Sequence, residues 1–144
     1  MSKSAADALK ARIDVIEESY ELWLAYAAKG VNAMTASKSD TMVRDTLQKA
    51  AGALPELAEL FLALAEDRGV SNAERYHSFI ELLRRDAADA LAAIQLVLAQ
   101  SAITSQMVDN LNAMIHLRAL LTDVFLIDEI LRPDAEQSPR STAS

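Results

Sequence analysis

Cysteine is absent from this chain of 144 residues. The sequence therefore excludes disulfides, thiolate zinc sites, iron–sulfur clusters and a cysteine nucleophile. Glycine and proline occur only three times each, and aromatic residues make up 5% of the chain. Alanine and leucine supply most of the 51% of residues that are hydrophobic. This composition is typical of packed helices.

Positive charge is also scarce, because 14 lysine and arginine side chains stand against 21 aspartate and glutamate side chains. The formal net charge is −7, and the isoelectric point is near 4.8. An acidic surface of this kind repels phosphate backbones. We therefore expect no nucleic-acid partner.

Long apolar runs are missing as well. No segment approaches the ~20 consecutive apolar residues that a membrane-spanning helix needs. The stretch from Met1 to Lys10 is polar and rich in alanine, unlike the apolar centre of a secretory leader. We therefore expect a cytoplasmic protein without a membrane span.

Apolar residues recur at alternating spacings of four and three in four segments, which cover residues 4–29, 40–68, 71–99 and 105–132. This spacing predicts an all-α, antiparallel up-down four-helix bundle. In the second helix Gly52 and Pro55 predict a kink, or a junction of two helices, because proline removes a backbone donor. We expect one domain over residues 1–132 and a disordered tail over residues 133–144, which has almost no apolar side chain.

The boundaries of these helical segments are predicted from residues that commonly cap helices. Gly30 is expected to end the first helix, and residues 31–39 form the longest predicted internal connection. The second helix is expected to begin at Asp40. Ser71 and Glu74 have the spacing of a capping box, in which each side chain bonds the backbone amide of the other residue.

The last segment has an apolar face that changes direction beyond Arg118. The two halves differ by about 150° at 100° per residue, far more than the ~20° per heptad that supercoiling accounts for. Either the helix bends, or its second half faces both its own bundle and a second chain. The second alternative predicts a symmetric homodimer whose candidate interface consists of Leu22, Tyr26, Val124, Ile127, Ile130 and Leu131.

Two histidines carry the only motifs that suggest chemistry. Glu74 and His77 form a Glu-x-x-His pair that resembles half of the ligand set of di-iron helical bundles, but Ala113 stands where His116 would need its glutamate. An exposed His116 in mid-helix resembles the histidine of phosphotransfer domains. That family usually places lysine and glycine three and four residues later, where this chain has Ala119 and Leu120.

These observations favour a non-enzymatic helical protein that acts through protein–protein interaction, as a homo-oligomer or an adaptor. The alternative is a binder of a small apolar ligand or a lipid-like surface through an opening bundle. A histidine phosphotransfer protein or a metal enzyme is a distant third. No catalytic residue, metal ligand or cofactor is assigned from the sequence.

Overall fold

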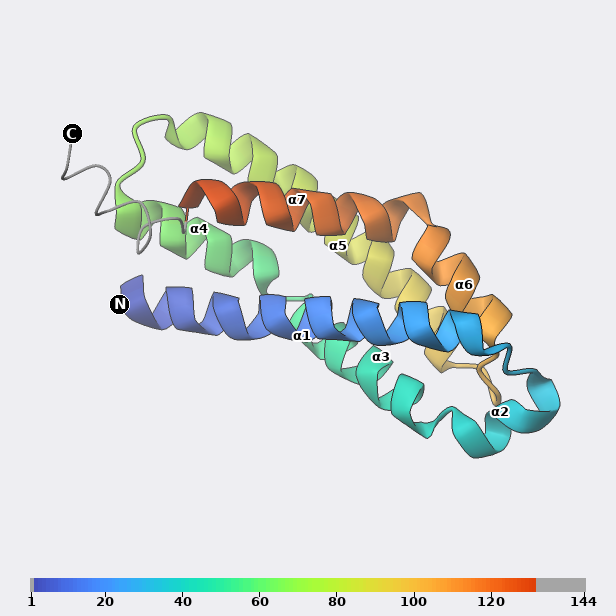
Figure 1. Ribbon diagram of the computed structural model, residues 1–144. Helices are drawn as coiled ribbons and strands as arrows, with labels where there is room; N and C mark the ends of the chain where they lie inside the picture. Colours follow the sequence, from blue (N-terminus) through green and yellow to red (C-terminus); the bar gives the residue numbers. More distant parts are fainter. Residues whose placement is uncertain (1, 132–144) are drawn as a thin grey trace.

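A computed structural model describes residues 2–131, and in this range the chain is entirely helical, without a strand. The all-α prediction is confirmed. Within the described range the chain forms seven helices, however, where the sequence predicted four (Figure 1). The predicted tail over residues 133–144 lies outside the described residues, and the single domain over residues 1–132 stays a prediction. No helix in the described range is long and apolar enough to cross a membrane.

The first predicted helix is present as α1, Ser2–Lys29. It ends at Gly30, which has a φ of 75°, a conformation that glycine adopts without steric cost. The side of α1 that faces the core contains the buried residues Leu9, Ile13, Ile16 and Trp23. The indole nitrogen of Trp23 donates a hydrogen bond to Oγ1 of Thr46, 2.9 Å away, as a buried tryptophan requires.

The expected connection over residues 31–39 contains a short helix, α2, Ala33–Ser39. Its start is a capping box that the sequence analysis missed. The Asn32 side chain accepts hydrogen bonds from the backbone amides of Met34 and Thr35, and the hydroxyl of Thr35 accepts one from the amide of Asn32. Asparagine with threonine provides the same reciprocal bonding as serine with glutamate.

The second predicted helix is two helices, α3, Thr41–Ala53, and α4, Leu57–Arg68. The interruption at residues 54–56 contains Pro55, as expected from its missing backbone donor. Gly69 ends α4 in the left-handed conformation with a φ of 62°. The second predicted helix is thus divided by a junction of two helices and not by a kink within one helix. This is the second of the two alternatives that the sequence left open.

The third predicted helix is α5, Ala73–Leu98. Its inner stripe is buried, with Ile80, Leu83 and Ile94 at the centre. The predicted capping box at its start is wrong, because the N-cap is Asn72 and no side chain caps the helix there.

The fourth predicted helix is α6, Ser105–Ala113, followed by α7, Ile115–Leu131. Met114 separates them with an extended backbone, φ −64° and ψ 136°. The break turns the chain and so accounts for the change in direction of the apolar face. Leu111 before the break and Leu120 beyond it both point into the core.

Packing joins these helices around one hydrophobic core, in which α1 contacts α3, α4 and α6, and α5 contacts α3, α4 and α7. Figure 1 shows α7 running alongside α5, while α6 turns away toward the end of α1. The arrangement leaves one side of α5 and α7 without a covering helix among the described residues.

Candidate interaction surface

An apolar groove lies between the first half of α5 and the second half of α7. It encloses about 270 Å³ and is lined by Asn72, Arg75, Tyr76, Phe79, Leu126, Ile127 and Ile130. Leu126 and Ile130 remain about half exposed at 51% and 50%. The apolar surface continues along α5 through Leu82, which is also exposed. Aliphatic and aromatic side chains are therefore available here to another molecule.

A second apolar groove lies between the last part of α5 and α6. It encloses about 330 Å³ and is lined by Ala93, Leu96, Val97, Gln100, Met107, Asn110, Leu111 and Met114. Leu96 is 67% exposed, more than any residue that lines the first groove with an aliphatic side chain.

Both grooves lie on the same side of α5. Phe79 in the first and Val97 in the second are 18 residues apart, which is five full turns and about 27 Å along the helix. Residues of α5 follow this side with the alternating spacing of a packing seam: Arg75, Phe79, Leu82, Asp86, Asp89, Ala93 and Leu96. We call this surface, with the facing residues of α6 and α7, the outer seam.

Charged groups occupy the centre of the outer seam, between the grooves. Asp123 of α7 is buried, and its carboxyl group is hydrogen-bonded to that of Asp86 of α5. The Oδ2 atom of Asp123 is buried without a hydrogen-bond partner. Near them, Nδ1 of His116 lies 3.7 Å from Oδ2 of Asp89. The seam is therefore apolar at both ends and carboxylate-rich in the middle.

Burial is the largest cause that raises the pKa of Asp123 to about 7, and the hydrogen bond and negative charge of Asp86 act in the same direction. Two carboxyl groups held together in this way repel each other when both are charged, and this repulsion favours the protonated form of Asp123. A cation placed beside the pair would compensate the second charge instead.

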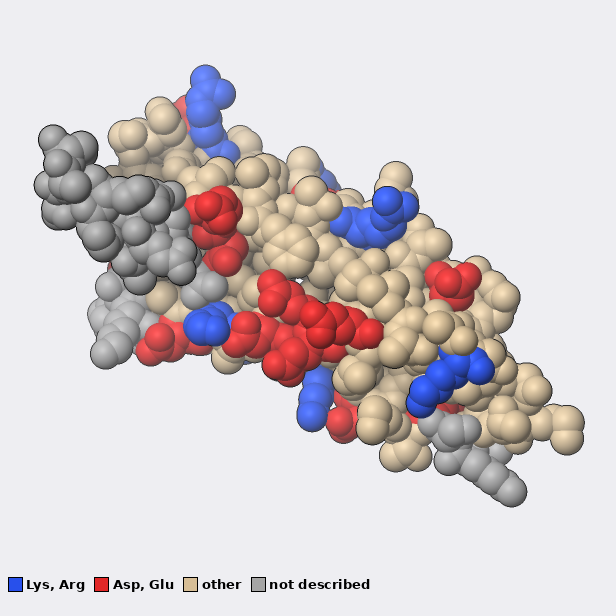
Figure 2. Space-filling view, viewed as in Figure 1, with Lys and Arg blue, Asp and Glu red and all other residues tan. Residues whose placement is uncertain are grey.

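A larger acidic group gathers over α1 on the face shown in Figure 2, while much of the surface over α7 is uncharged. Glu17 lies on α1, close to other carboxylates. Its pKa is raised by partial burial and then by the negative charges of Asp14, Asp128 and Glu21. The electrostatic surroundings of α7 thus repel negatively charged partners and attract positively charged ones.

The structure separates the six residues of the predicted dimer interface. Val124, Ile127 and Leu131 are buried in the core of the chain, and Tyr26 is buried with its hydroxyl donating to the carbonyl of Ile103 over 2.6 Å. These four side chains are almost fully covered within the chain, although Ile127 also contributes to the lining of the first groove. Leu22 and Ile130 are exposed, but only Ile130 lines a groove of the outer seam.

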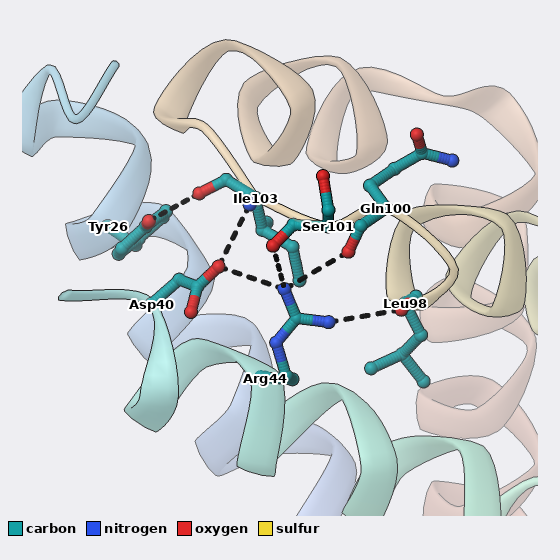
Figure 3. A network of polar contacts seen from close by, with 7 residues as sticks. All are labelled: Tyr26, Asp40, Arg44, Leu98, Gln100, Ser101 and Ile103. Carbon is teal, nitrogen blue, oxygen red and sulfur yellow. Dashed lines mark hydrogen bonds and ion pairs between the residues drawn. The ribbon is translucent and has the colours of Figure 1, made fainter. Parts of the chain in front are cut away.

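A polar network at the other end of the molecule was not foreseen in the sequence (Figure 3). Asp40 lies at the N-cap of α3, as predicted, but its side chain does not cap that helix. Its Oδ2 atom instead accepts hydrogen bonds from the backbone amide of Ile103 and from Arg44, both at 2.9 Å. The guanidinium of Arg44 also donates to the carbonyls of Leu98, Gln100 and Ser101.

We call Asp40 and Arg44 the clamp, because they fix the connection between α5 and α6 to the start of α3. Ser105 adds to this junction, since its hydroxyl accepts a hydrogen bond from the amide of Val31 and donates one to the carbonyl of Tyr26. Every polar atom of the clamp that is buried has a partner in the described chain. The clamp is therefore structural and leaves no polar group directed at a ligand.

The two histidines remain apart. His77 and Glu74 are exposed near the start of α5, whereas His116 lies beside Asp89 on the outer seam. Among the described residues no group of three or more histidine, aspartate or glutamate side chains is placed to hold a metal ion.

Comparison with known proteins gives no further assignment. No protein family, no curated protein and no solved structure matches this chain.

Proposed function

We propose that this protein acts through protein–protein interaction, without catalysing a reaction, and that the outer seam is its contact surface. The observation that carries the proposal is the pair of apolar grooves on one side of α5, with Leu96, Leu126 and Ile130 at least half exposed. Exposed apolar grooves of this kind mark interaction sites, because covering them removes apolar area from water at ~25 cal/mol per Å².

The size of the grooves favours a protein over a small molecule. Their volumes of about 270 and 330 Å³ lie at the lower limit of the roughly 300–1,000 Å³ of pockets that enclose a small ligand. Grooves of this size fit individual side chains of a partner. Tyr76 and Arg75 line the first groove, and tyrosine and arginine are enriched among residues that dominate binding energy.

The contact surface would be carried by a bundle of four segments, namely α1, α3 with α4, α5, and α6 with α7. In support, α1 and α5 each pack against the α3–α4 segment and against the α6–α7 segment. That neighbour pattern is expected of an antiparallel bundle with α1 and α5 on a diagonal. A cytoplasmic location remains part of the proposal.

Light scattering on the full chain over a concentration series tests the proposal. A homo-oligomer predicts a mass above 15.7 kDa that falls to the monomer mass when Leu96 and Leu126 are both replaced by glutamate. Phe125→Glu is the matched control, because Phe125 is 47% exposed on α7 but lines neither groove. A monomer that binds a hydrophobic dye through Leu96 and Leu126 would contradict a homo-oligomer and favour the small apolar ligand over it.

A further inference from the structure

The chemistry of the partner follows from the order of groups along the outer seam, if the proposed function holds. We infer that the outer seam binds one amphipathic helix of another protein, with apolar side chains at its two ends and lysine or arginine at its centre. The apolar ends enter the two grooves, and the central cations meet Asp86, Asp89 and Asp123.

Geometry sets the length of this helix. The grooves are separated by 18 residues of α5, or about 27 Å, so a straight helix needs about 18–20 residues to reach both. Apolar side chains three and four residues apart on one face are the anchors with which helices occupy grooves of this type. The partner therefore has two apolar clusters on one face, separated by about two turns that carry positive charge.

Charge complementarity requires the cations. Oδ2 of Asp123 has no hydrogen-bond partner among the described residues, and no lysine or arginine is among the groups that set the pKa of Asp123. Asp89 is exposed, and its Oδ2 atom lies 3.7 Å from Nδ1 of His116. An apolar centre in the partner would leave these carboxyl groups desolvated and unpaired, which costs free energy. A lysine or arginine supplies donors that the exposed Asp89 and the half-buried Asp86 can accept.

A second copy of this chain fits the outer seam less well than a helix with positive charge at its centre. A two-fold contact places the same patch on both subunits, so the centre of one outer seam would meet the centre of the other. Asp86 and Asp89 would then face their own copies, and like charges in an interface are unfavourable.

Two other occupants lack the required chemistry. The segment 132–144 of this chain contains only Ala135 and Ala143 as apolar residues, so it has no anchor for either groove. The cytoplasmic surface of a membrane is negatively charged and would be repelled by the central carboxylates.

A titration of the full-length protein with two labelled synthetic peptides tests the inference. Both peptides are 21-residue amphipathic helices with leucine and isoleucine in the first and last heptads. They differ only in the middle heptad, where the inward-facing residues are lysine in one and glutamate in the other. Fluorescence anisotropy is expected to show saturable binding of the lysine peptide and about tenfold or weaker binding of the glutamate peptide.

Protein variants locate the contact. Leu96→Glu and Leu126→Glu should each weaken binding of the lysine peptide about tenfold, because each places a charge in one groove. Phe125→Glu should leave it unchanged. Asp89→Asn should reduce the preference for lysine over glutamate, since Asp89 is exposed and its substitution leaves the core intact.

Four results would overturn the inference. Equal binding of the two peptides would mean that charge plays no part in recognition, and an equal effect of Phe125→Glu and Leu126→Glu would place the contact elsewhere. If neither peptide binds but light scattering finds a dimer that Leu96→Glu and Leu126→Glu dissociate, the occupant is a second copy. In that case the basic helix is wrong while the proposed function stands. A monomer that binds neither peptide nor itself contradicts both.

Discussion

Asp40 and Asp123 are both buried, with 5% and 9% of their surfaces exposed, but their surroundings differ. The carboxylate of Asp40 accepts hydrogen bonds from a guanidinium and from a backbone amide. These bonds link the start of α3 to the connection before α6. Asp123 is met by a second carboxyl group and keeps one oxygen without a partner. A buried carboxylate can thus be stabilised by a counter-charge or neutralised by a proton. The first arrangement joins two segments of the fold, and the second makes the charge of the buried carboxyl group depend on pH.

The largest effect is expected from removing the carboxylate of the clamp. Asp40→Ala leaves Arg44, which is only 27% exposed, without its counter-charge and leaves the amide of Ile103 without an acceptor. Breaking a buried pair in this way should lower the free energy of unfolding by about 3–5 kcal/mol. Urea denaturation of the variant and the wild type measures the difference.

Asp45→Ala is the matched control for that measurement. Asp45 lies on the same helix and pairs with Lys49 at 3.2 Å, but both side chains are exposed. Its removal should change stability by less than about 0.5 kcal/mol. If the two variants lose the same amount, the clamp contributes no more than a surface ion pair.

A smaller loss is expected from Arg44→Lys. Lysine keeps the charge next to Asp40, but it lacks the planar fork with which Arg44 reaches Asp40 and the carbonyls of Leu98, Gln100 and Ser101 together. We expect a loss of about 1–2 kcal/mol, the value of one or two hydrogen bonds. An unchanged urea midpoint would show that the carbonyl contacts contribute little.

The smallest change in the free energy of unfolding, and one that stabilises the protein, is expected from a substitution at Asp123. Its pKa is about 7 in the folded protein and near 3.8 when unperturbed. Between these values the folded state holds a proton that the unfolded state has released, so this group makes the protein less stable as pH rises from about 4 to about 7. Asp123→Asn keeps a donor for Asp86 but cannot ionise.

The variant should therefore be more stable than the wild type at pH 8, by the order of 1 kcal/mol. This difference should shrink toward pH 5, where the wild-type carboxyl group is already protonated. Thermal unfolding of both proteins across this range provides the comparison. A difference that stays constant with pH would mean that Asp123 does not titrate in this window.

The elements that the sequence predicted well are those with a local cause. Gly30 and Gly69 end helices because glycine adopts a positive φ without strain, and Pro55 interrupts the second segment because it has no amide hydrogen. The buried stripe of α5 follows from helical periodicity alone.

The elements that were missed have causes outside their own segment. Neither glycine nor proline occurs near Met114, so no local signal marks the break that divides α6 from α7. The dimer interface was predicted from an excess of apolar residues on one helix, and the break turned Val124, Ile127 and Leu131 into the core instead. A count of apolar side chains does not reveal how many faces the chain itself will cover.

By itself the sequence determined the all-helical class, the residues that face inward along α1 and α5, and the ends of helices at glycine, because each depends on spacings within one helix. Only the tertiary structure decided which apolar residues stay exposed. It also brought Asp40 and Arg44 to the connection near Ile103, and Asp86 to Asp123, since these pairings join segments that are distant in the chain. Periodicity determines the face of a helix on which a side chain lies, whereas packing between helices determines what that side chain meets.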